Sequence, residues 1–169
     1  MNTGDIAKTL GTLLAELLDG PSKAGGYILN PGDPGLVRSL EKVSAADASI
    51  RTPTGSSIAA HVDHVRYGFS LMNRWSQGEN PFGGADWNDS WRKTTVSDAE
   101  WRQRLADLRA EATRWLTVVR EPREINEIEL NGMIGSIAHL AYHLGAIRQI
   151  NPSPRGPGEG AKSNEVDSR

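Results

Sequence analysis

The sequence contains no cysteine among its 169 residues. This absence excludes disulfide bonds, zinc sites with thiolate ligands and cysteine nucleophiles, so any thiol chemistry needs a thiol from outside the chain. A chain without cysteine is also compatible with a reducing compartment, and we expect the protein to be cytoplasmic. The N-terminal residues lack a basic segment followed by an uninterrupted apolar core, so we predict no secretion signal.

An excess of positive charge is lacking as well. The 19 Lys and Arg residues are set against 21 Asp and Glu residues, which gives a formal net charge of -2. Proteins that bind the phosphate backbone usually carry a basic face, so we expect no nucleic-acid partner. The longest uncharged stretch, residues 131–147, is shorter than the about 20 residues of a membrane span and contains two histidines, so we expect no membrane partner either.

Four segments repeat apolar residues at the spacing of an α-helix, and none alternates with the period of a strand. The predicted long helices cover residues 5–18, 56–77, 97–121 and about 132–150. Residues 20–35 are dense in glycine and proline, which predicts a long loop, and Pro34 is expected in the first turn of a short helix. The last long helix is apolar nearly all round, so we expect protein to surround it.

These segments predict an all-α fold with the architecture of a four-helix bundle. The length corresponds to one domain, which we place over residues 1–150. Residues 151–169 are rich in proline, glycine, serine and charge, and we predict a disordered C-terminal tail there.

All four histidines fall in two of the predicted helices. His139 and His143 are four residues apart on the last helix, and His61 and His64 are three apart on the second, so each pair shares a helix face. Three imidazoles from such pairs suit a divalent ion such as Zn, Ni or Fe and leave a position open for water or substrate. The alternative is that the four are core or surface histidines, hydrogen-bonded to backbone or water. A zinc peptidase is disfavoured, because Leu140 stands where its motif has the catalytic glutamate.

Two segments, TGSSIAAHVDHVRY and IAHLAYHLGAIRQI, resemble the DinB/YfiT-like family of four-helix-bundle metalloenzymes. The resemblance implies an up-down-down-up bundle, commonly dimeric, with a metal held by one histidine of the second helix and an HxxxH pair of the last. Carried onto this sequence, the metal ligands are His64, His139 and His143. Gly145 matches the glycine that follows the pair in the family.

The resemblance favours His64 over His61 as the third ligand, because Ser57 stands seven residues before His64 and a serine or threonine at that place usually opens the motif. His61 is then an additional residue of this sequence. It is an alternative metal ligand, a residue that holds a ligand in place, or a core histidine.

The family includes S-transferases and isomerases that use low-molecular-weight thiols. The resemblance therefore implies a metal-dependent thiol S-transferase, or a related hydrolase or isomerase, with a small electrophile as its substrate. A divalent ion on neutral imidazoles could lower the pKa of an external thiol. The alternative is a non-enzymatic dimeric protein, stress-associated or an interaction partner, with a structural metal or none, since the nearly charge-free last helix could need a partner surface.

Three further residues have two interpretations each. Trp87 and Trp91 lie in a predicted irregular segment and either form a wall beside the metal or seal the end of the bundle. Arg148 either faces an anionic substrate or favours the dipole at the end of the last helix.

Overall fold

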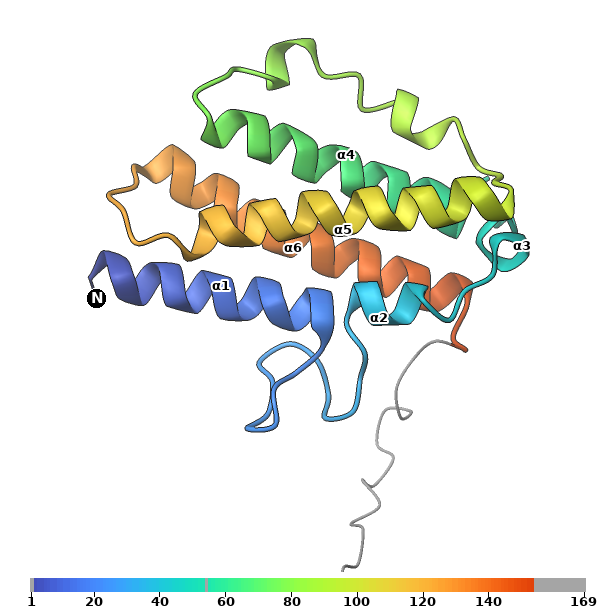
Figure 1. The fold of residues 1–169 in the computed structure, drawn as a ribbon, viewed down its shortest axis with the longest axis horizontal. Coiled ribbons are helices and arrows are strands. Elements are labelled where there is room, and N and C mark those ends of the chain that lie inside the picture. Colours follow the sequence, from blue (N-terminus) through green and yellow to red (C-terminus); the bar gives the residue numbers. More distant parts are fainter. Residues whose placement is uncertain (1, 54, 154–169) are drawn as a thin grey trace, which may run out of the picture.

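The computed structural model describes residues 2–53 and 55–153, and its long elements are all helical (Figure 1). The four long helices are α1 (Thr3–Asp19), α4 (Ile58–Ser76), α5 (Asp98–Arg120) and α6 (Glu127–Ile150), and the shorter elements are α2 (Leu36–Leu40), α3 (Ala45–Ala48), η1 (Phe82–Gly84) and η2 (Asp89–Trp91). The predicted all-α class is confirmed for this part of the chain, which has a single isolated β-bridge and no strand. Most of the predicted tail, from residue 154 on, lies outside the described residues.

Side-chain caps fix where the long helices begin. A capping box starts α5, because Ser97 accepts from the backbone N–H of Glu100 and the Glu100 carboxylate accepts from that of Ser97. A second box, between Asn126 and Glu129, starts α6 ahead of the predicted residue 132. At α4, Ser57 accepts from the third residue of the helix. Each cap satisfies backbone donors that have no partner inside the helix.

The long helices enclose one core. α4 packs against α5 and α6, and α1 packs against the same two helices, so the four lie side by side (Figure 1). The largest side chains at the centre are fully buried: Leu14, Leu17, Leu108, Trp115, Leu140 and Leu144. Each contributes roughly 1.5–3 kcal/mol through its removal from water. None of the described helices combines the length and the apolar character that crossing a membrane requires.

One face of α6 is open to solvent, which corrects the expectation that protein surrounds this helix. Ile128, Ile134 and Tyr142 are 74%, 49% and 69% exposed, whereas Leu140 and Leu144 on the opposite face are buried. The sequence was misleading here because the outward face carries uncharged residues. In a sequence pattern, an exposed face without charge cannot be distinguished from a buried one.

The long loop between α1 and α2 is tied to α1 by a buried carboxylate. Glu16 accepts three backbone N–H groups, from Tyr27 at 2.9 Å, Ile28 at 2.7 Å and Leu29 at 2.6 Å. Burial alone would raise the pKa of Glu16, but the three donors outweigh it and the pKa is lowered. Gly26 permits this approach, because a Cβ there would collide with the carboxylate.

Arg148 ties the same loop to α6. Its guanidinium lies 3.2 Å from Oδ2 of Asp33 and donates at 2.9 Å to the carbonyl of Pro34. Arg148 lies in the last turn of α6, as the dipole interpretation expects, whereas its hydrogen bonds go to the loop and give no support to a substrate contact. Pro34 itself stands before Gly35, the N-cap of α2, and not in the first turn of the helix as predicted.

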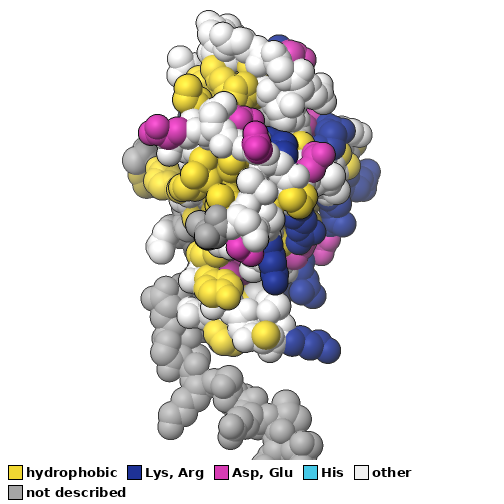
Figure 2. All heavy atoms as spheres, turned by 90° about the vertical axis from the view of Figure 1, so that its left-hand side faces the viewer, with side chains coloured by type: hydrophobic (Ala, Val, Ile, Leu, Met, Phe, Trp, Pro, Cys, Tyr) yellow, Lys and Arg dark blue, Asp and Glu magenta, His cyan; other side chains and the backbone are white. Residues whose placement is uncertain are grey.

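The bundle end formed by the start of α1 and the ends of α4 and α5 carries both signs of charge (Figure 2). Lysine and arginine side chains gather along one edge of this face, with acidic side chains beside them, and no histidine is seen there. The mixture of charges agrees with the near balance of the sequence.

We expect Glu16→Gln to lower the free energy of unfolding by about 1–3 kcal/mol, because an amide replaces a carboxylate that accepts three buried N–H groups. Urea unfolding at pH 7 measures the loss. Glu124→Gln, at an exposed position, is the matched control and should change stability by less than about 0.5 kcal/mol.

The same pair of proteins gives a pH test. Because the folded state lowers the pKa of Glu16 below its usual value of 4.5, its contribution to stability is complete above that pH. The contribution is lost as the pH falls through the folded-state pKa. The stability gap between wild type and Glu16→Gln should therefore shrink from pH 7 to pH 3, and a constant gap would contradict the role of the charge.

Candidate metal centre

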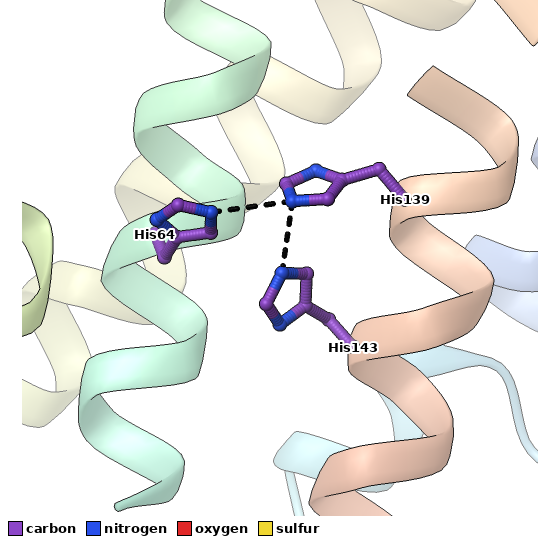
Figure 3. A group of neighbouring side chains, drawn as sticks. All are labelled: His64, His139 and His143. Atoms are coloured by element: carbon purple, nitrogen blue, oxygen red, sulfur yellow. Dashed lines mark hydrogen bonds between the residues drawn. The ribbon is translucent and has the colours of Figure 1, made fainter. Parts of the chain in front are cut away.

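Three histidine side chains converge between α4 and α6 (Figure 3). Nε2 of His139 lies 3.2 Å from Nε2 of His64 and 2.9 Å from Nε2 of His143. One ring nitrogen from each of the three lies within 4.8 Å of the others, an arrangement that could hold a metal ion. His64 and His143 are buried and His139 is half-buried. The structure thus brings together the three residues that the sequence singles out as ligands.

The cap of α4 and the spacing of the histidines on α6 place the three rings together. The Ser57 hydroxyl donates to the carbonyl of Thr94 at 2.7 Å and accepts from the N–H of Ala60, which fixes both the start of α4 and its place beside the chain before α5. His64 follows two turns later on the face toward α6. On α6, His139 and His143 are one turn apart and point to the same side, as the spacing of four predicts.

Ser90 determines which nitrogen of His64 faces its neighbours. The Ser90 hydroxyl donates to the carbonyl of Trp87 at 2.8 Å, and a carbonyl can only accept. Ser90 Oγ therefore accepts from Nδ1–H of His64, 2.9 Å away. The proton sits on Nδ1, and the lone pair of Nε2 points toward His139, as a metal ligand requires.

His61 lies behind His143. The two Nδ1 atoms are 2.8 Å apart, so one ring donates to the other. A hydrogen on Nδ1 of His143, accepted by His61, leaves the Nε2 lone pair of His143 facing His139. Of the three interpretations of His61, the geometry favours a residue that holds a ligand in place.

All four rings are neutral near pH 7. Burial, followed by the neighbouring imidazoles, lowers the pKa of His143 to about 3 and that of His64 to about 4, although Asp63 partly opposes the shift of His64. Burial also lowers the pKa values of His61 and His139. Neutral imidazole is the form that binds a metal, so protons compete little for these nitrogens.

The arrangement fits a cation better than it fits hydrogen bonds alone. With both Nδ1 hydrogens used as described, the Nε2 atoms of His64 and His143 each present a lone pair to His139. Nε2 of His139 carries at most one hydrogen, so it can donate a well-aligned hydrogen bond to only one of these two lone pairs. Tetrahedral ligands with bonds of about 2.0–2.1 Å stand about 3.3 Å apart, close to the spacings found here. A small divalent ion would satisfy all three lone pairs.

Trp87 and Trp91 form a wall over the cluster. The ring of Trp91 lies 4.5 Å from that of His64 and 5.0 Å from that of His61, and Trp87 lies 5.5 Å from His64. The segment around η2 packs on α4 and carries both tryptophans. The structure therefore favours the wall beside the histidines over a seal at the bundle end.

Other residues near the motif stay outside the cluster. Asp63 forms an ion pair with Arg66 at 2.9 Å, one turn along the same helix. Gly145, the glycine of the resemblance, is exposed, and a Cβ there would meet open space. Ser90 was missed by sequence reasoning, because a single serine in an irregular segment carries no periodic signal and its partner His64 is 26 residues away.

A comparison of the chain with family models, curated proteins and solved structures finds no match. The resemblance to the DinB/YfiT-like family thus stays a prediction from two segments.

We expect Ser90→Ala to weaken metal binding by about 10- to 100-fold without unfolding the protein, because His64 loses the group that fixes its proton on Nδ1. Competition with a chromophoric chelator measures the affinity. Ser70→Ala is the matched control, since the Ser70 hydroxyl donates to Tyr67 of its own helix. Equal affinities in the two variants would show that Ser90 does not position the ligand.

A second pair of variants separates the two histidines of α4. His64→Ala should abolish stoichiometric metal binding, because it removes a ligand. His61→Ala should retain about one ion per chain at reduced affinity, because it removes only the acceptor behind His143. Element analysis after dialysis distinguishes them, and the reverse result would make His61 the ligand.

Proposed function

We propose that the protein is a divalent-metal-dependent enzyme of the DinB-like group. His64, His139 and His143 hold the ion, and an external low-molecular-weight thiol or water molecule attacks a small electrophile. The observation that carries the proposal is the convergence of three Nε2 atoms in a site with neutral imidazoles only. Three protein ligands are typical of catalytic metal sites, which keep a position for a reactant.

The direction of the helices supports the family part of the proposal. In Figure 1, α1 and α6 run from left to right along the chain, and α4 and α5 run from right to left. This order corresponds to the up-down-down-up bundle that the resemblance implies.

A divalent Zn, Ni or Fe ion on three neutral imidazoles supplies positive charge that lowers the pKa of a thiol or water molecule beside it. The chain's own residues orient and shield the site. Ser90 and His61 hold the rings of His64 and His143, and the tryptophan wall keeps bulk water from one side. Since the chain has no cysteine, a thiol nucleophile has to come from outside.

Element analysis tests the proposal together with an activity screen. Protein purified without chelator or nickel resin should contain about one Zn, Ni or Fe per chain, and His139→Ala should contain little. Wild type should accelerate transfer of a low-molecular-weight thiol to a chlorodinitrobenzene, and His139→Ala should lose that rate. Gln149→Ala, exposed on α6, should retain both. Unchanged metal content in His139→Ala would overturn the proposal.

The second candidate is a non-enzymatic homodimer, and the open face of α6 favours it. Ile128, Ile134 and Tyr142 are exposed there and could bury apolar area against a second copy. A monomer at micromolar concentration in analytical ultracentrifugation would argue against this candidate. Azide distinguishes the two candidates, since a cobalt-loaded catalytic site should change its absorption spectrum on azide binding and a closed structural site should not.

A further inference from the structure

A cavity of about 280 Å³ lies between α4 and α6, directly beside the histidine cluster. Its wall contains no charged side chain and is mostly aliphatic and aromatic. The main contributors are Phe69, Met72, Phe82, Trp87, Leu140 and His139. Trp87 and His139 belong to both the cavity and the histidine site, so the two are continuous.

Three glycines within helices line this cavity, and none of them has a positive φ. Crowding requires Gly132 of α6, because a Cβ there would lie 2.6 Å from the ring of Trp75. The same does not hold for Gly68 of α4 and Gly135 of α6. A Cβ at Gly68 would make ordinary contacts, 3.8 Å from Trp87 and 3.9 Å from His139, and a Cβ at Gly135 would meet open space. Glycine in a helix costs roughly 0.5–1 kcal/mol relative to alanine. Since neither backbone geometry nor crowding requires glycine at these two positions, its effect there is to keep the space open.

His139 presents a polar edge to the cavity. Figure 3 shows its second ring nitrogen, Nδ1, on the side away from His64 and His143. When Nε2 binds a metal, Nδ1 carries the hydrogen, and within residues 2–53 and 55–153 no hydrogen bond uses it. The hydroxyl of Ser136, also in the wall, already donates to Met133 and accepts from Trp115. His139 is therefore the donor that a molecule in the cavity can reach.

We propose that this cavity binds an uncharged aromatic part of the substrate, with a hydrogen-bond acceptor such as a carbonyl beside His139. The inference rests on the proposed function, because it names the class of electrophile that the metal site would act on. A charged group is disfavoured, since it would lose its hydration without gaining an ionic partner in the wall. The volume is ample for one substituted ring, because an apolar cavity of about 150 Å³ accommodates benzene.

Calorimetric titration of the purified full-length protein tests the inference with two probes of equal size, acetophenone and benzoate. Acetophenone should bind at least tenfold more tightly than benzoate. Gly135→Leu should weaken acetophenone binding at least tenfold, because the side chain grows into the cavity. Gly145→Leu is the matched control on the same helix, outside the cavity wall, and should stay within twofold of wild type. Equal effects of the two substitutions, or equal binding of the two probes, would overturn the inference.

Gly68→Ala is a second variant in case the leucine disturbs α6. Its methyl group lies between Trp87 and His139 without a close contact, so the fold is retained and acetophenone binding should fall about threefold. Unchanged binding in Gly68→Ala would place the probe elsewhere and contradict the inference.

Metal content measured on the same samples separates the two proposals. Acetophenone binding that depends on Gly135, in protein without metal, would support the cavity and count against the metal enzyme. Stoichiometric metal without acetophenone binding would support the metal enzyme and count against the cavity.

Discussion

Four imidazole rings lie together between α4 and α6, where burial lowers the pKa of each and neighbouring imidazoles lower those of His64 and His143 further. Each ring then has one donor and one acceptor to satisfy away from water, which restricts how it can turn. His64 uses Ser90, His143 uses His61, and the Nε2 atoms of His64, His139 and His143 point at one another. Because unpaired polar atoms are costly inside a protein, this arrangement constrains the register of the two helices.

The irregular segment before α5 depends on the same constraint. Trp91 packs on the rings of His64 and His61, and Ser90 between the tryptophans supplies the hydrogen bond that orients His64. At the other end of the segment, the Thr94 carbonyl accepts from Ser57, the cap of α4. A stretch without long regular structure is thus anchored to α4 at two places. The contacts that hold this segment in place are therefore the same contacts that orient the histidines.

The sequence predicted the long helices well, because their apolar spacing is a local signal. It also predicted the convergence of His64 with His139 and His143, although only the resemblance selected His64 over His61. The structure favours that choice through the contact of His61 with the far nitrogen of His143.

Contacts between distant segments were not predictable. The Glu16 carboxylate binds backbone groups of the following loop, and the sequence showed it only as an interruption of an apolar run. Helix α3 is four residues long, too short for a periodic signal, and the start of α6 was misplaced because its first turn is acidic. Whether α6 is covered depends on packing and not on composition, so its open face was missed as well.

The proposed function requires that three histidine Nε2 atoms form a metal site with room for a reactant. X-ray absorption spectroscopy of the zinc-loaded protein tests it most directly, because imidazole ligands have a distinctive multiple-scattering signature. We predict about three imidazole nitrogens and one further oxygen or nitrogen ligand at about 2.0–2.1 Å, with His64→Ala losing the zinc. A shell made mainly of oxygen ligands, or a spectrum unchanged by His64→Ala, would show that these histidines do not bind the metal.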